Sequence, residues 1–246
     1  MASGDLIVAS RTLRQPSVPF VPDGEYKADL MITTSEQDHL HSNLGTGFSE
    51  ISKLLKPQDS SQLLSVVTRL SRYTLAMDDY VAARLDAPPL NRLANQRDAT
   101  QHALMSSCPW TSDFKSEAKS PLHVAIWSAA TVYSLLVVFP IPVADPFARL
   151  GQEIRLQLSD PMVYNRWHEA DKLLLWITSM GAIATIDHSE RFWYLSVLDR
   201  LTHRLRIADW PGLKQELQNF LWYPKTSDVD GEKLWKDLRS SNPFIT

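Results

Sequence analysis

The feature that most constrains this chain is LHVAIWSAATVYSLLVVF, a nearly continuous apolar stretch over residues 122–139. A membrane-spanning helix needs about 20 apolar residues, and this stretch almost reaches that length. No second stretch of this kind follows, and polar side chains interrupt this one at His123, Ser128, Thr131, Tyr133 and Ser134. We therefore expect a helix that is buried on most sides in a soluble domain, and no membrane span.

Helical spacing of apolar residues continues on both sides of this stretch. Apolar residues recur three or four positions apart from Leu63 to Ala83, and again at Leu150, Ile154 and Leu158. No run of strands alternates between apolar and polar residues. The sequence predicts an all-α fold, an irregular bundle of about eight helices, with further helices in residues 91–107, 172–186, 187–205, 209–222 and 230–238.

The first 42 residues differ from the remainder. They show no apolar period and carry Pro16, Pro19 and Pro22, so we expect residues 1–42 to form an extended or partly disordered arm. Residues 43–246 then form the helical domain. The N-terminus has no basic segment followed by an apolar one, so we expect no secretion signal.

Charge and cysteine content exclude several classes of protein. The net charge is -3, with lysines and arginines scattered singly, whereas nucleic-acid-binding domains usually carry a basic surplus or stripe. We expect no direct nucleic-acid binding by this chain. A single cysteine, Cys108, allows no intramolecular disulfide and no cysteine-rich zinc site. This usage is typical of a nuclear or cytoplasmic protein.

The strong catalytic and cofactor motifs do not occur. GxGxxG, the P-loop, HExxH, GxSxG and CxxC are all missing. Gly45-Thr46-Gly47 follows no strand, so we interpret it as a turn and not as a phosphate cradle. His39 and His41 lie in the polar arm, and metal sites need three or four convergent ligands. We expect neither a metal nor a cofactor.

Two polar residues have both a structural and a functional interpretation. His123 shares a helical face with Trp127, so it is either satisfied by a neighbour or a polar group in an apolar pocket that orients a ligand or moves a proton. Arg191 either pairs with a buried or semi-buried acid that fixes the packing of two helices, or clamps an anionic ligand group. These patterns do not identify a catalytic residue. His123 and Arg191 are the candidates under an enzymatic interpretation.

Local patterns also predict details of packing. Gly181 inside a helix costs about 1 kcal/mol relative to alanine, so a second helix or a ligand should approach closely there. Asp187 and Glu190 match a capping box, and Asp209 is expected to cap the helix that follows it. Most of the eight tryptophans belong in the core. The residues predicted to bind a ligand are Trp127, Tyr133, Trp176 and Met180.

Several segments between residues 122 and 238 resemble one protein family. They are LLVVFPIP, RLGQEIRLQL, KLLLWITSMGAIATIDHSERFWYLSVLDRL and IADWPGLKQELQNFLWYPKTSDVDGEKLW. In this order and spacing they are similar to the C-terminal regulatory (middle-homology-like) domain of fungal zinc-cluster transcription factors. The resemblance covers about half of the chain and implies a helical domain that senses a small-molecule effector, or contacts a protein partner as a homodimer or with another regulator.

Members of that family carry an N-terminal DNA-binding module in which six cysteines hold two zinc ions. With Cys108 alone, this chain lacks that module. It is therefore either the regulatory part of a larger protein or a stand-alone relative. A stand-alone relative opens the alternative of an enzyme of secondary metabolism, of the cyclase or isomerase type, because a shaped apolar pocket with one acid or base would suffice.

Overall fold

The computed structural model describes residues 2–21, 43–110, 119–141, 145–160 and 170–240. Within these ranges the chain forms ten α-helices, one 3-10 helix and one π-helical segment, and no strand. The all-α class predicted from the sequence is confirmed. The count is ten rather than about eight, because α1 (Ala2–Thr12) and the short α3 (Ile51–Leu54) add to the expected set.

Each segment that the apolar spacing predicted contains a helix. These helices are α4 (Pro57–Val81), α5 (Leu90–Ser106), α6 (Pro121–Tyr133), α7 (Asp145–Leu158), α9 (Asp171–Ala184), α10 (Arg191–Arg204), α11 (Trp210–Leu217) and α12 (Pro224–Ser240). The 3-10 helix η1 (Thr46–Glu50) precedes α3, and α6 continues directly into the π-helical η2 (Ser134–Val138).

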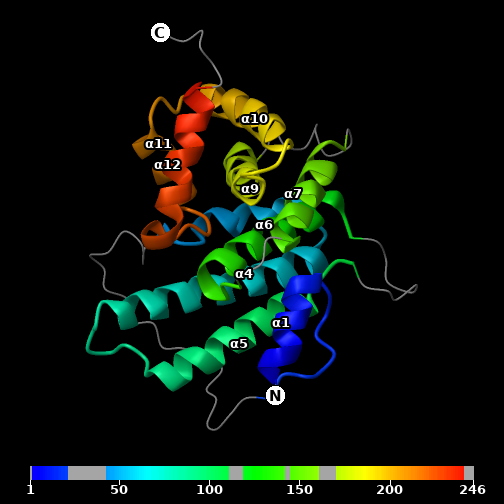
Figure 1. The fold of residues 1–246 in the computed structure, drawn as a ribbon, viewed down its shortest axis with the longest axis vertical. Helices are drawn as coiled ribbons and strands as arrows, with labels where there is room; N and C mark the ends of the chain where they lie inside the picture. The colour runs from blue at the N-terminus through cyan, green and yellow to red at the C-terminus, as the bar shows by residue number, and fades with distance from the viewer. Residues whose placement is uncertain (1, 22–42, 111–118, 142–144, 161–169, 241–246) are drawn as a thin grey trace.

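Two groups of helices lie on either side of α6 and α7 (Figure 1). The first contains α4 and α5, which pack against each other, and α1, which packs on α5. In the second, α10, α11 and α12 surround α9. α6 and α9 contact each other in the centre, where every residue of 122–133 and of 173–184 is buried. These two helices therefore form the middle of the core.

The apolar stretch that constrains the fold is a core helix. Pro121–Val138 is the only helix in the described ranges long and apolar enough to cross a membrane, and 89% of it is buried inside the structure. Two of its polar side chains are hydrogen-bonded within the protein: Thr131 donates to the carbonyl of Trp127, and Ser134 donates to Gln101. The expectation of a helix buried on most sides is confirmed.

The start of the chain departs from the expected extended arm. Residues 2–12 form α1, and Leu6, Ala9 and Leu13 are buried in the core. The Gln101 side chain links α1 to the centre, because its amide nitrogen donates to Ser10 while its oxygen accepts from Ser134. Three apolar residues are too few to predict a helix, and α5 and α7 supply the surface that makes it stable. Residues 22–42 of the expected arm lie outside the described residues.

One predicted cap is wrong and one is confirmed. α10 begins only at Arg191, its N-cap position is Glu190, and none of the described side chains caps it. The residues between Thr185 and Arg191 form turns, so Asp187 lies three residues before the N-cap position. The expected capping box needs Asp187 at the N-cap itself and therefore cannot form. Asp209, in contrast, accepts a hydrogen bond from the backbone N–H of Gly212 at 2.9 Å and caps α11.

The close helix approach predicted at Gly181 is confirmed. A Cβ atom at this position would collide with the ring of Tyr194 on α10. The Tyr194 hydroxyl donates a hydrogen bond to the carbonyl of Gly151 on α7. The glycine therefore allows one tyrosine to join α7, α9 and α10.

Candidate functional site

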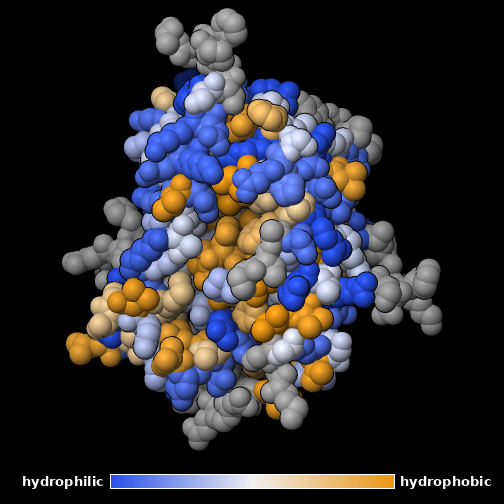
Figure 2. Space-filling model, viewed as in Figure 1, coloured by the Kyte–Doolittle hydropathy of each residue, from blue (hydrophilic) through white to orange (hydrophobic). Residues whose placement is uncertain are grey.

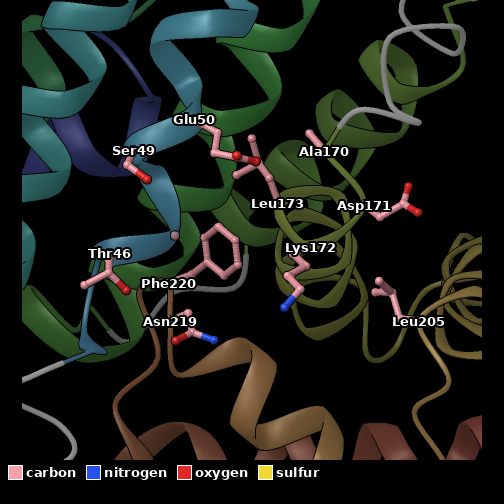
Figure 3. Close-up of a pocket in the computed structure, with 11 residues that line it drawn as sticks. Thr46, Ser49, Glu50, Ala170, Asp171, Lys172, Leu173, Leu205, Asn219 and Phe220 are labelled. Atoms are coloured by element: carbon pink, nitrogen blue, oxygen red, sulfur yellow. The ribbon is translucent and has the colours of Figure 1, made fainter.

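A cleft of about 600 Å³ lies where four segments distant in sequence meet (Figure 3). We call it the η1–α9 cleft. It is formed by η1, the first turn of α9, the residue after α10 and the two residues that precede Leu221. Its lining residues are Thr46, Gly47, Ser49, Glu50, Ala170, Asp171, Lys172, Leu173, Leu205, Asn219 and Phe220.

Two glycines hold η1 against the segment that follows α11. The N–H of Gly47 donates to the carbonyl of Asn219 at 2.7 Å, and that of Gly45 donates to the carbonyl of Phe220 at 3.3 Å. Gly45 has a φ of +86°, a backbone conformation that residues with a side chain rarely adopt. A Cβ atom on Gly47 would lie 2.7 Å from the ring of Phe220. The predicted turn is therefore present at Gly45, while Thr46 and Gly47 begin η1 and form one wall of the cleft.

The floor of the cleft is apolar and rests on an aromatic cluster. Phe220 lies at the centre of the lining in Figure 3, and only 2% of it is exposed. Behind it, the Phe48 ring packs edge-on against both Phe220 and Trp176. The Trp176 indole donates to the carbonyl of Leu221 at 2.9 Å. Because these rings are interlocked, the floor has a fixed shape.

Each charged side chain that lines the cleft is paired with a residue outside the lining. The Lys172 ammonium lies 2.9 Å from Glu216 on α11, and Asp171 pairs with Arg204 at the end of α10. Glu50 pairs with Lys53 one turn later. A ligand carrying a full charge would have to compete with these pairs. An uncharged ligand can instead accept a hydrogen bond from Lys172, since its ammonium has three N–H donors.

The size and lining of the cleft suit a small organic molecule. Ligand pockets generally measure about 300–1,000 Å³ and combine an apolar surface with a few polar groups that orient the ligand. Here Ala170, Leu173 and Phe220 supply a buried apolar surface, while Thr46 and Ser49 are exposed at the rim. This arrangement can bind an uncharged molecule with an apolar body and polar groups along one edge.

The four residues predicted to bind a ligand do not line this cleft. Trp127, Tyr133, Trp176 and Met180 are all buried core residues, with at most 1% of any of them exposed. Trp127 donates to the carbonyl of Leu104, and the hydroxyl of Tyr133 is hydrogen-bonded to Thr74. Trp176 comes nearest to the cleft, because its ring is stacked on that of Phe220.

The structure places Arg191 in a structural role. Its guanidinium donates to the Asp237 carboxylate on α12 at 2.6 Å and to the carbonyl of Ala182 on α9 at 2.5 Å. It thus joins three helices, as the first of its two interpretations predicts. It does not line the η1–α9 cleft.

His123 is a buried side chain at the start of α6. None of the described residues hydrogen-bonds to either ring nitrogen, and the Asp59 carboxylate lies 3.8 Å from Nδ1. Asp59 is already paired with Lys119 at 2.8 Å. Burial lowers the pKa of His123 to about 4, although Asp59 acts in the opposite direction. His123 is therefore neutral at pH 7, and it does not line the cleft.

Sequence reasoning missed most of the residues that form the cleft. Asn219 and Phe220 follow a helix, and nothing local marks them as neighbours of a turn at residues 45–47, which is far away in the sequence. The Gly-Thr-Gly turn was the one available signal. Its position against α9 depends on tertiary packing.

Comparisons with known proteins found no relatives. No protein-family model matches the chain, and no curated protein or solved structure matches it. In the part of the chain that the structure describes, no three histidine, cysteine or acidic side chains are grouped so that they could hold a metal ion. The η1–α9 cleft is consequently the basis for the functional proposal.

Proposed function

We propose that this chain is a regulatory domain that binds an uncharged small molecule in the η1–α9 cleft. The observation that carries the proposal is the combination of a buried apolar floor around Phe220 with an exposed polar rim and charges that are already paired. A ligand seated there would touch η1, α9, α10 and the segment after α11 together. Binding would therefore stabilise the packing of these segments.

The regulatory role rests on the resemblance to the C-terminal domain of fungal zinc-cluster transcription factors. An all-α fold agrees with that resemblance. On this proposal the chain acts in the nucleus or cytoplasm, and its ligand is an effector linked to secondary metabolism. A homodimer or another regulator as partner follows from the same resemblance. Sedimentation of the purified chain across a range of concentrations would test the homodimer.

The enzymatic alternative has less support from the geometry. Its candidate residues were His123 and Arg191, and both are buried away from the cleft, with Arg191 held by Asp237 and Ala182. A general acid or base has to come within hydrogen-bonding reach of its substrate. This placement supports binding over catalysis.

A cleft-filling substitution tests the proposal. Ser49 is exposed on the rim, so Ser49→Trp would fill the cleft without disturbing the core. Ser52→Trp is the matched control, because Ser52 is exposed one turn later and lies outside the lining. The ligand panel would be uncharged aromatic alcohols, hydroxyketones and lactones, with binding measured by calorimetry.

We expect at least one member of the panel to bind with a stoichiometry of one. Ser49→Trp should weaken that binding tenfold or more, while Ser52→Trp should leave it unchanged. Equal binding to both variants, or no binding by any member, would contradict the proposal. Mass spectrometry of the same mixtures would detect a product if the enzymatic alternative were correct.

A further inference from the structure

A second pocket lies at the opposite end of α9. Its volume is about 230 Å³, and it is formed by the C-terminal end of α9 and the following turn, together with η2, α7 and α12. We call it the α9–α12 pocket. α9 has 14 residues, so about 20 Å of helix separates it from the η1–α9 cleft. Of the residues that the structure describes, none lines both sites.

One side of the α9–α12 pocket is apolar. Leu136 of η2, Phe147 of α7 and Ile183 of α9 line it, together with Ala184 and Ile186. Figure 2 shows hydrophobic residues gathered in the middle of the face between α7 and α12, with hydrophilic residues around them. The volume corresponds to roughly eight water molecules at about 30 Å³ each. A ligand of this size would have a short chain or a single ring.

Among the described residues that line it, the other side carries negative charge and no lysine or arginine. Asp187, His188 and Asp230 complete the lining. Within the described ranges, neither carboxylate makes a side-chain hydrogen bond or an ion pair, unlike Asp171 and Asp237, which are both paired with arginines. The pocket also lies at the C-terminal end of α9, where the helix dipole contributes partial negative charge.

Asp230 is the more significant of the two carboxylates because it is partly buried. Burial raises the pKa of Asp230, and the positive charges of Lys233 and Arg191 offset only part of this effect. Arg191 is already bound to Asp237 and Ala182, and Lys233 is exposed. A carboxylate in such surroundings gains from a cation placed directly beside it.

We propose that the α9–α12 pocket binds a small organic cation, a protonated primary amine on a short apolar body. The ammonium would lie between Asp187 and Asp230, and the apolar body would pack against Leu136, Ile183 and the aromatic ring of Phe147. An aromatic ring beside a bound cation adds to the attraction. This proposal does not rest on the function proposed for the η1–α9 cleft.

The probe for this site is 2-phenylethylamine, and its neutral analogue 2-phenylethanol has the same shape without the positive charge. Asp230→Asn removes the partly buried carboxylate, and Asp187→Asn removes the exposed one. Glu232→Gln is the matched control, since Glu232 is exposed on the same helix and lies outside the pocket. Calorimetry would measure binding, and circular dichroism would verify that each variant is folded.

We expect 2-phenylethylamine to bind to one site at least tenfold more tightly than 2-phenylethanol. Asp230→Asn should weaken amine binding tenfold or more, and the double variant with Asp187→Asn should abolish it. Glu232→Gln should leave it unchanged. Equal affinities for amine and alcohol, equal losses in Asp230→Asn and Glu232→Gln, or no amine binding at all would overturn the proposal. Ser49→Trp should not affect amine binding, so the two proposed sites can fail independently.

Discussion

The stability of this protein should depend on pH through His123, and the structure allows the size of the effect to be worked out. The side chain is fully buried, and its pKa falls from an ordinary value of 6.5 to about 4. Because the folded-state pKa lies below the unfolded-state value, the neutral ring stabilises the folded protein fully above pH 6.5. That contribution is lost progressively as the pH falls from 6.5 to about 4.

Over this pH range the free energy of unfolding should fall by about 3 kcal/mol through His123, since each tenfold difference in proton affinity corresponds to about 1.4 kcal/mol. The free energy of unfolding would be measured by urea titration between pH 7 and 4 at constant ionic strength. His123→Met replaces the ring with an apolar side chain of similar size. Acidic residues titrate in both proteins, so the difference between wild type and variant isolates His123.

At pH 7 the variant should be at least as stable as the wild type, because it removes two ring nitrogens that no described residue satisfies. At pH 4 the variant should be more stable by about a further 3 kcal/mol. His203→Gln is the control, because His203 is exposed. A difference between wild type and His123→Met that stays constant across the pH range would refute the reasoning. So would a wild type that gains stability relative to the variant on acidification, which would mean that a protonated His123 pairs with Asp59.

Three further substitutions test the packing in urea or thermal unfolding. Gly181→Ala should destabilise the protein by about 1–3 kcal/mol, because its Cβ atom would collide with the ring of Tyr194; an unchanged midpoint would show that the helices can separate there without cost. Arg191→Met should lower the free energy of unfolding by roughly 2–3 kcal/mol, since it leaves the Ala182 carbonyl and Asp237 without their guanidinium partner. Arg200→Met on the exposed face of α10 is the control and should leave it nearly unchanged. Asp209→Ala should cost about 1 kcal/mol through loss of the α11 cap, whereas Asp187→Ala, which removes no cap, should cost less.

Local patterns were sufficient wherever a segment carries its own signal. The spacing from Leu63 onward predicted α4, and Asp209 followed by Pro211 predicted the start of α11. α1 and the start of α10 were predicted wrongly, because α1 has only three core residues and the turn before α10 runs past the apparent capping box.

The candidate site could not be predicted in the same way. Trp127, Tyr133, Trp176 and Met180 have the composition of a binding pocket, but close packing of α6 and α9 leaves them buried. The cleft formed instead where the ends of helices meet. Its position depends on how far each helix extends and on the bonds between Gly45, Gly47 and the segment after α11.

Residue spacing was sufficient to predict that this chain is all-α and that residues 122–139 form a core helix. At Gly181 it predicted a close approach by a second helix or by a ligand. These properties follow from hydrophobic spacing and from the size of single side chains, which act over one or two turns of helix. The space available to a ligand and the charges left unpaired depend on how the helices pack together. Empty space and unpaired charge arise between segments far apart in the sequence, so no local pattern records them.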